Sequence, residues 1–331
     1  MSMEYAVSVI MISYNHEKYI AQAIESVLEQ KTDFIFEILL GDDASTDGTQ
    51  NIIRKYATQY KDRFRLILRQ KNIGATNNIK DLMARAKGKY LAFLETDDYW
   101  CDCHKLQKQF DFLESNLQYS GCGHQCHVVD EKGRLLQEMN RNNDRNYWYF
   151  SKNIYDIHDF NMAKAPGQLA SLFCRNYWIQ QKKELNIISY AHYLISDKTI
   201  LMLLLCRGNI YFMNEVMHCY RLVEKKGQNN YKSLARTQNL RYEEYLYFCI
   251  IEAYAKERKH IDIDLSLVKK DKLICASVFF LKNMSWSNLL VVIQMIFERG
   301  RVIHNTLICV RAIILKCYYM YILKEDRPIC I

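Results

Sequence analysis

The chain has 331 residues, half of them apolar, with 45 basic and 37 acidic side chains. This size and composition suffice to bury one large core or two unequal ones, which excludes the small classes that depend on disulfides or a structural metal. Two prolines and eleven glycines exclude long linkers, and the net charge of +8, without a basic and aromatic stripe on one element, does not indicate a nucleic-acid-binding protein.

The first residues read as the start of a strand rather than as a signal peptide. They lack a basic region and a small-residue cleavage site, and the apolar run breaks at Ser13 and Asn15. Twelve cysteines without an export signal are expected to be free thiols in a reducing cytoplasm. Two clusters, CDCH (101–104) and CGHQCH (122–127), lack the paired CxxC spacing of zinc sites. We expect buried cysteines and polar loop histidines there rather than a metal.

Four strand, loop and helix units follow one another in the first part of the chain. The predicted strands are the short apolar runs at 6–12, 34–40, 64–68 and 90–94. After the first three runs, apolar residues recur at helical spacing, near 19–28, 52–60 and 79–86. Such a series predicts the α/β class, with a mostly parallel sheet covered by helices on both faces.

The second half is less regular. Residues 121–136 predict two strands joined by a turn at 130–133, and 138–166 a long loop over a site. A strand at 170–175, a buried helix ended by Gly208 and a strand at 209–213 follow. From about residue 233 the pattern is helical.

Polar segments follow each of the four predicted parallel strands. They are SYNH (13–16), GDDASTDGT (41–49), RQKNIGATNN (69–78) and ETDD (95–98). Ligands of open α/β sheets bind beyond the carboxyl ends of the strands, so these segments form the predicted site. The chain has neither a P-loop nor a GxGxxG after a strand, so phosphate must be held in another way.

Two of these segments are rich in carboxylates. Alone, ETDD could be a helix start capped by Asp97 or Asp98, and GDDASTDGT one capped by Asp47 or Thr46. Two acidic loops on strands of one sheet are harder to explain as caps. Carboxylates at a strand end can hold Mg²⁺ or Mn²⁺, which bridges to the phosphates of a nucleotide.

Three stretches, in this order, carry a resemblance to a known family. VSVIMISYNHEKYIAQAIESVLEQ, ILLGDDASTDGT and GKYLAFLETDDYW resemble the landmarks of the family 2 glycosyltransferases, over about residues 5–225. The resemblance implies the GT-A fold and an inverting, metal-dependent transfer from a nucleotide diphosphate sugar. It implies a GT-A domain at 1–225, with a nucleotide-sugar half at about 1–100 and an acceptor half at about 101–225, followed by a helical region at 226–331.

The resemblance also implies roles for individual residues. Tyr14 would lie beside the donor base and Asp43 would hydrogen-bond it; Asp97 and Asp98 match the acids that contact the ribose and the metal diphosphate, without a choice between them as metal ligand. Glu95 stands where many members have an aspartate. The implied donor-binding residues are Ser13, Tyr14, Asn15, Asp43, Asn78, Glu95, Asp97 and Arg221, and the implied metal ligands are Asp97 and Asp98. Asn72, Gly74 and Asn78 could line the base pocket, and turn formation explains the Asn-x-Gly of this segment equally well.

An inverting transfer needs a carboxylate that takes the proton of the acceptor hydroxyl. Asp197 is the first candidate, because similar family members place an acid at this helix start. A helix N-terminal charge is its alternative explanation, and Asp156 and Asp159 are reserve candidates. Arg221 is expected to assist the departing diphosphate, with a surface ion pair as the alternative.

The expected function is transfer of single sugars from a UDP-sugar to a saccharide or lipid-linked saccharide in bacterial surface glycan synthesis, because the QxxRW motif of processive synthases is missing. A nucleotidyltransferase and an inactive sugar-binding module are the alternatives. The first needs a glycine- and arginine-rich phosphate loop, which SYNHEKY is not. The second is at odds with the intact acids.

The tail at 286–324 is strongly apolar, but basic and acidic residues interrupt it before ~18 apolar residues accumulate. These residues are Glu298, Arg299, Arg301, Arg311 and Lys316. We expect a helix pair in the membrane interface, and hence a cytoplasmic protein that is peripheral on the inner face of the cytoplasmic membrane. A plain helical bundle is the alternative.

Overall fold

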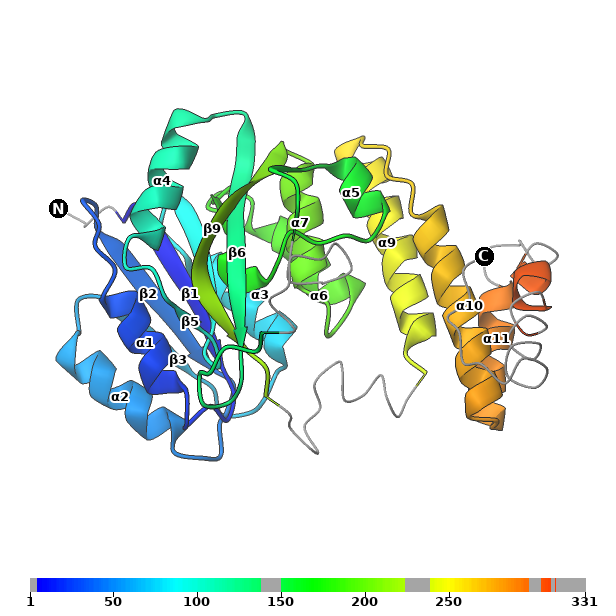
Figure 1. Ribbon diagram of the computed structural model, residues 1–331, viewed down its shortest axis with the longest axis horizontal. Helices are drawn as coiled ribbons and strands as arrows, with labels where there is room; N and C mark the ends of the chain where they lie inside the picture. Colours follow the sequence, from blue (N-terminus) through cyan, green and yellow to red (C-terminus); the bar gives the residue numbers. More distant parts are fainter. Residues whose placement is uncertain (1–4, 138–149, 224–238, 298–304, 311–312, 314–331) are drawn as a thin grey trace. The chain divides into compact units, whose positions relative to one another are not determined.

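The computed structural model describes residues 5–137, 150–223, 239–297, 305–310 and 313. Contacts divide the chain into two compact units: Met1–Phe160 with Lys164–Glu224, and Asn161–Ala163 with Lys225–Ile331. The first unit is built on one mixed sheet with helices on both faces (Figure 1). The second unit is helical in its described part.

The sheet begins as a parallel α/β sheet and ends as a mixed one. The strands run in the order β3-β2-β1-β4-β8-β6-β9-β5, with β7 paired to β9. β1 is parallel to β2 and β4, and β2 to β3, whereas β8 is antiparallel to both of its neighbours. The strands are β1 (Val7–Ser13), β2 (Phe36–Asp42), β3 (Phe64–Leu68), β4 (Tyr90–Glu95), β5 (Tyr99–Trp100), β6 (Tyr119–Val129), β7 (Ile154–Tyr155), β8 (Phe173–Arg175) and β9 (Asn209–Arg221).

Helices fill the connections that parallel strands require. The helices of this unit are α1 (Ile20–Leu28), α2 (Thr49–Gln59), α3 (Ala75–Arg85), α4 (Lys105–Ser115), α5 (Ile157–Asn161), α6 (Asn186–Ala191) and α7 (Asp197–Leu205), with short 3-10 helices at Leu169–Ser171 and Lys182–Leu185. The predicted α/β fold and the first three strand and helix units are therefore confirmed.

The side chains of each strand point alternately to the two faces of the sheet, so an apolar layer forms on each face. Val7, Val9 and Met11 of β1 pack in one core with Ile24 of α1 and Ile53 of α2, as expected when successive side chains point to opposite faces. On the other side, α3 lies close to β2: a Cβ atom on Gly41 would lie 2.4 Å from Oδ1 of Asn78. The glycine thus permits this close approach.

Several predictions for the second half need correction. The second strand expected after the turn at 130–133 is a single bridge between Val129 and Leu135. The strand expected at 170–175 is short, because a 3-10 helix takes its first residues. The strand expected at 209–213 continues to Arg221, because it pairs with β6 along this whole length. Of the loop expected at 138–166, the first twelve residues lie outside the described ones, and the rest contains β7 and α5.

The second unit contains a helical core of its own. Its described helices include α9 (Arg241–Lys259), α10 (Ser266–Lys282) and α11 (Trp286–Phe297), and residues 305–310 are also helical. Tyr245, Leu273 and Met295 belong to one buried cluster. In the part of the chain that the structure describes, no helix is both long and apolar enough to cross a membrane. The interrupting charges at 298, 299, 301, 311 and 316 lie outside the described residues.

A buried lysine lies at the start of α4. Lys105 is fully buried, its Nζ donates a hydrogen bond to Oε1 of Gln109 at 2.7 Å, and it lies 4.2 Å from the ring centre of Trp100. Burial lowers the pKa of Lys105 from 10.5 to about 7. Between these values the unfolded chain binds a proton that the folded chain does not, so Lys105 costs stability at neutral pH and costs less as the pH rises toward 10.5.

Replacing Lys105 should therefore stabilise the protein in a pH-dependent way. We expect Lys105→Met to raise the free energy of unfolding at neutral pH by about 1–3 kcal/mol, because the lost bond to Gln109 offsets part of the relieved burial cost. The gain should shrink toward about pH 10. Urea unfolding at both pH values measures it, with Lys55→Met at an exposed position of α2 as control. An equal loss of stability at both pH values would contradict the assignment.

Candidate active site

The loops after β1 and β2 are joined into one piece. The amide of Asp43 donates to the carbonyl of Ser13 at 2.9 Å, and Oδ1 of Asn15 accepts from the amide of Thr46 at 2.8 Å. Asn15 has φ 56°, a left-handed conformation that asparagine tolerates better than most residues. Tyr14 between them is 42% exposed. Its ring is thus presented at the surface by a loop that is held in place on both sides.

Asp43 connects this piece to the loop after β3. Its Oδ1 accepts from the amide of Ile73 and its Oδ2 from the amide of Gly74, both at 2.8 Å. Gly74 has φ 84°, which glycine adopts without a steric cost. Ala44, which follows Asp43 in the chain, has φ 61°. A left-handed backbone conformation in a non-glycine residue is strained, and such strain is commonly found at functional sites. Asp43 therefore holds together the loops expected to surround the donor base.

Two of the residues predicted to bind the sugar donor have buried side chains that hydrogen-bond to other parts of the protein. Asn78 is 1% exposed; its Nδ2 donates to the carbonyl of Gly41 at 2.8 Å and its Oδ1 accepts from Arg69 at 3.0 Å. Arg221 is 4% exposed and donates to the carbonyl of Asp97 at 2.9 Å and to Oε1 of Gln22 at 2.7 Å. Direct contact with the donor stays a prediction for both residues, and the structure gives each a supporting role.

The acidic segment after β4 forms a tight turn, not a helix start. The amide of Asp98 donates to the carbonyl of Glu95 at 3.0 Å, and the chain then enters β5. The alternative in which Asp97 or Asp98 caps a helix is therefore wrong. The backbone N–H of Arg221 donates to Oδ1 of Asp98 at 2.7 Å, so the last residue of β9 fixes the turn.

The carboxylates of this turn lie in an unfavourable environment. Burial, followed by the negative charges of Asp97 and Asp197, raises the pKa of Glu95 to about 8. Burial, followed by Asp97 and Glu95, raises the pKa of Asp98 well above its usual range. Tyr220 faces the same acids: burial and then their charges raise the pKa of its phenol. The three acids therefore share one site, as the sequence predicts, and they repel one another.

A histidine and a threonine that sequence reasoning missed lie beside the turn. Nδ1 of His16 forms a hydrogen bond with Oγ1 of Thr96 at 2.8 Å, and its Nε2 lies 3.8 Å from Oδ2 of Asp97. The position of His16 in the polar segment after β1 was the available signal, because that segment and ETDD end neighbouring strands. His16 thereby joins the base-side loops to the acids.

Asp197 lies close enough to the acids to influence them, because its charge contributes to the raised pKa of Glu95. It occupies the first turn of α7 and also lines a small cavity with Gly167 and Leu201. The reserve candidates have other partners. Asp159 is fully buried and its carboxylate lies 2.8 Å from Nζ of Lys152. The carboxylate of Asp156 accepts from the amide of Asp159 at 3.0 Å, at the start of α5.

The turn fits a divalent cation. In the described part of the chain, Oδ2 of Asp98 is buried and has no hydrogen-bond partner. A buried carboxylate oxygen without a donor is costly unless a cation approaches it. Asp97 is half-buried beside it, and carboxylate oxygens are the ligands that Mg²⁺ and Mn²⁺ prefer. Asp97 and Asp98 are therefore suited to hold such an ion.

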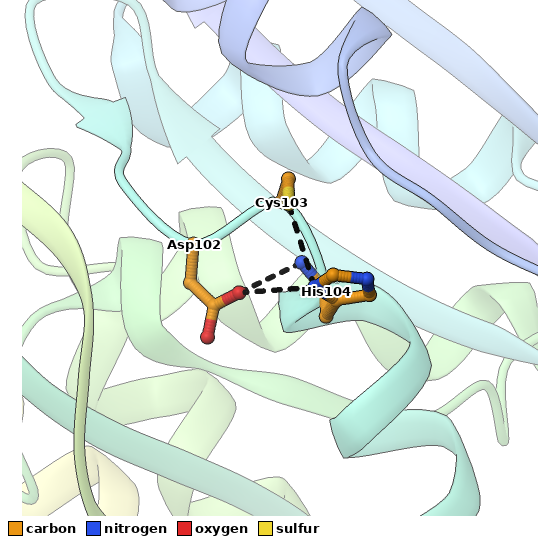
Figure 2. A group of neighbouring side chains, drawn as sticks. All are labelled: Asp102, Cys103 and His104. Atoms are coloured by element: carbon orange, nitrogen blue, oxygen red, sulfur yellow. Dashed lines mark hydrogen bonds and ion pairs between the residues drawn. The ribbon is translucent and has the colours of Figure 1, made fainter.

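A second group of metal-ligand residue types has another explanation. Figure 2 shows Asp102, Cys103 and His104 turned toward one another, with donor atoms within 4.8 Å. The carboxylate of Asp102 accepts from the amide of His104 and from Nζ of Lys108, both at 2.8 Å. An ammonium group already neutralises this carboxylate. We assign the group to the start of α4, and all ten cysteines in the described residues are free thiols, as expected.

Comparison with known proteins agrees with this geometry. Residues 8–171, which contain β2 to β4, all of β1 except Val7, and all three acids of the turn, match the model for glycosyl transferase family 2. Residues 8–171 form a glycosyltransferase family 2 domain. An uncharacterized protein of Mycobacterium tuberculosis is 46% identical over 132 residues, which are 40% of this chain and 38% of the relative.

Two further similar proteins have informative names. The putative teichuronic acid biosynthesis glycosyltransferase TuaG of Bacillus subtilis is 37% identical over 125 residues, covering 38% of this chain and 48% of TuaG. The chain thus spans less than half the length of these curated relatives. Residues 1–349 of S. aureus TarS, solved in complex with UDP-GlcNAc, share the fold: the TM-score is 0.62 at 16% identity, over 96% of this chain and 92% of that chain.

Proposed function

We propose that this chain is an inverting glycosyltransferase that moves one sugar from a UDP-sugar to a saccharide or lipid-linked saccharide. The observation that carries the proposal is the convergence of Asp43 and of the turn with Asp97 and Asp98 at the carboxyl ends of β2 and β4, with Asp197 near enough for its charge to raise the pKa of Glu95. The family 2 domain supports the reaction class. The UDP-GlcNAc complex of TarS, which has the same fold, supports UDP as the nucleotide.

On the donor side, one group of residues would bind the base, and another group would bind the ribose and the diphosphate. The exposed ring of Tyr14 would lie against the uracil, with the carboxylate of Asp43 held beside it. Glu95 and Asp97 would face the ribose, and Asp97 and Asp98 would hold Mg²⁺ or Mn²⁺. When bound, that ion supplies Lewis-acid stabilisation of the charge on the diphosphate leaving group.

On the acceptor side, the reaction needs one proton transfer. The acceptor hydroxyl attacks the anomeric carbon, the bond from that carbon to the diphosphate oxygen breaks, and the carboxylate of Asp197 takes the hydroxyl proton. Attack opposite the leaving group inverts the anomeric configuration. The proximity of Asp197 to Glu95, shown by its effect on the pKa of that residue, supports this role.

The proposed class of acceptor follows from the name of a relative. TuaG is named for teichuronic acid biosynthesis, which supports a glycan of the bacterial cell surface as the product. Such glycans would be extended on the cytoplasmic side of the membrane, in reach of nucleotide sugars. We place the protein there, peripheral on the inner face.

A donor screen tests the proposal. Purified protein is incubated with UDP-, GDP- and dTDP-sugars, with Mn²⁺ or with EDTA, and the released nucleotide is identified. We expect release of UDP from one UDP-sugar, with Mn²⁺ only. Release of pyrophosphate from a sugar phosphate and UTP would instead indicate a nucleotidyltransferase, and UDP-sugar binding without turnover in the presence of diverse acceptors an inactive module.

A further inference from the structure

The second unit has a helix face that a water-exposed helix rarely has. Trp286, Leu290, Ile293 and Phe297 of α11 are 81%, 54%, 38% and 65% exposed. Their spacing of four, three and four residues places all of them on one side of the helix, within a sector of roughly 60° at 100° per residue. We call these four residues the α11 stripe. Large apolar side chains gathered in this way mark an interaction surface more often than chance exposure.

The stripe is not needed to attach α11 to its own unit. Val292 and Met295, on the opposite side of the helix, are buried in the cluster that includes Tyr245 of α9 and Leu273 of α10. The helix is therefore apolar on both sides, with one side in the core and the other at the surface. The outer side can be occupied by a partner without rearrangement of the core.

Charge indicates what kind of partner fits. Residues 226–331 contain 17 basic and 10 acidic side chains, which is +7 of the chain's net charge of +8. A positively charged region attracts an anionic lipid surface. It repels a second copy of itself, which disfavours a dimer through this face. Trp286, the most exposed residue of the stripe, is of the type that prefers the boundary between headgroups and acyl chains.

We propose that the α11 stripe docks on an anionic lipid bilayer, with α11 lying in the plane of the interface. An apolar helix face in a region of net positive charge is suited to bind a membrane in this orientation. The inference concerns the second unit and stands independently of the catalytic proposal, since none of its residues belongs to the candidate active site.

The experiment is flotation of the full chain with vesicles of phosphatidylcholine, with and without phosphatidylglycerol. The stripe variant carries Trp286→Ser, Leu290→Ser and Phe297→Ser. A matched control carries Ile35→Ser, Leu117→Ser and Tyr190→Ser, three exposed apolar residues of the first unit. We expect wild type and control to float with the anionic vesicles, and to float less at high salt. The stripe variant should bind these vesicles at least roughly tenfold more weakly than wild type.

Tryptophan emission gives a second readout. A blue shift on addition of anionic vesicles that is lost in Trp286→Phe comes from Trp286, because the other three tryptophans remain in that variant, and it locates the contact at the stripe. UDP release with a soluble acceptor should be equal in all variants, which separates this proposal from the catalytic one.

Three results would overturn the proposal. Wild type that does not float with anionic vesicles is one of them. Equal flotation of wild type and stripe variant is another, and it would place membrane contact elsewhere. Finally, a wild-type dimer in sedimentation that becomes monomeric in the stripe variant, without vesicle binding by either, would make the stripe an interface between copies of this chain.

Discussion

Asp197→Asn should lower turnover by a factor on the order of a hundred or more while the affinity for UDP stays nearly unchanged. The amide keeps the size of the side chain but cannot accept the hydroxyl proton. Because Asp197 belongs to α7 and not to the turn with Asp97 and Asp98, the donor site should stay intact. Turnover is measured as UDP release at saturating donor, and affinity by calorimetry with UDP and Mn²⁺.

The matched control for this variant is Asp111→Asn, at an exposed position of α4. It should have the turnover of wild type. If Asp197→Asn also keeps wild-type turnover, the role of base passes to Asp156 or Asp159. Asp159 is the less favoured of these, because its carboxylate is fully buried and already paired with Lys152.

The strands that carry the site could be predicted from the sequence because their signals are local. The apolar run before Glu95 and the polar residues after it mark a strand end within a few positions, and the structure has β4 at Tyr90–Glu95. The same holds for β1, β2 and β3. Since parallel strands end at one edge of a sheet, local signals were enough to bring Asp43 and Asp97 to the same side.

The supporting contacts could not be predicted because they are not local. Arg221, which binds Asp98, lies 123 positions after it in the chain. The amides that bind Asp43 lie 30 and 31 positions after that residue. Nothing in the spacing of these residues indicates the pairing. The same limit explains β9, whose length follows from its bulged parallel pairing with β6 rather than from its own apolar pattern.

The two acids of the turn provide the second large effect. The double variant Asp97→Asn, Asp98→Asn should lose the metal-dependent part of UDP binding, and turnover should fall on the order of a thousandfold, since Lewis-acid stabilisation of a leaving diphosphate contributes several kcal/mol. Asparagine can still accept the bond from the amide of Arg221 that holds the turn. Calorimetry with UDP in Mn²⁺ and in EDTA measures the binding.

Thermal unfolding separates a lost ion from a damaged fold. In EDTA the double variant should be at least as stable as wild type, because neutral amides relieve the cost of burying charge and the mutual repulsion, which together raise the pKa of Glu95 and Asp98. Mn²⁺ with UDP should raise the melting temperature of wild type and leave that of the double variant unchanged. The control pair Asp62→Asn, Asp111→Asn, both exposed, should respond as wild type does. Wild-type UDP binding that is equal in Mn²⁺ and in EDTA would show that these carboxylates hold no ion for the donor.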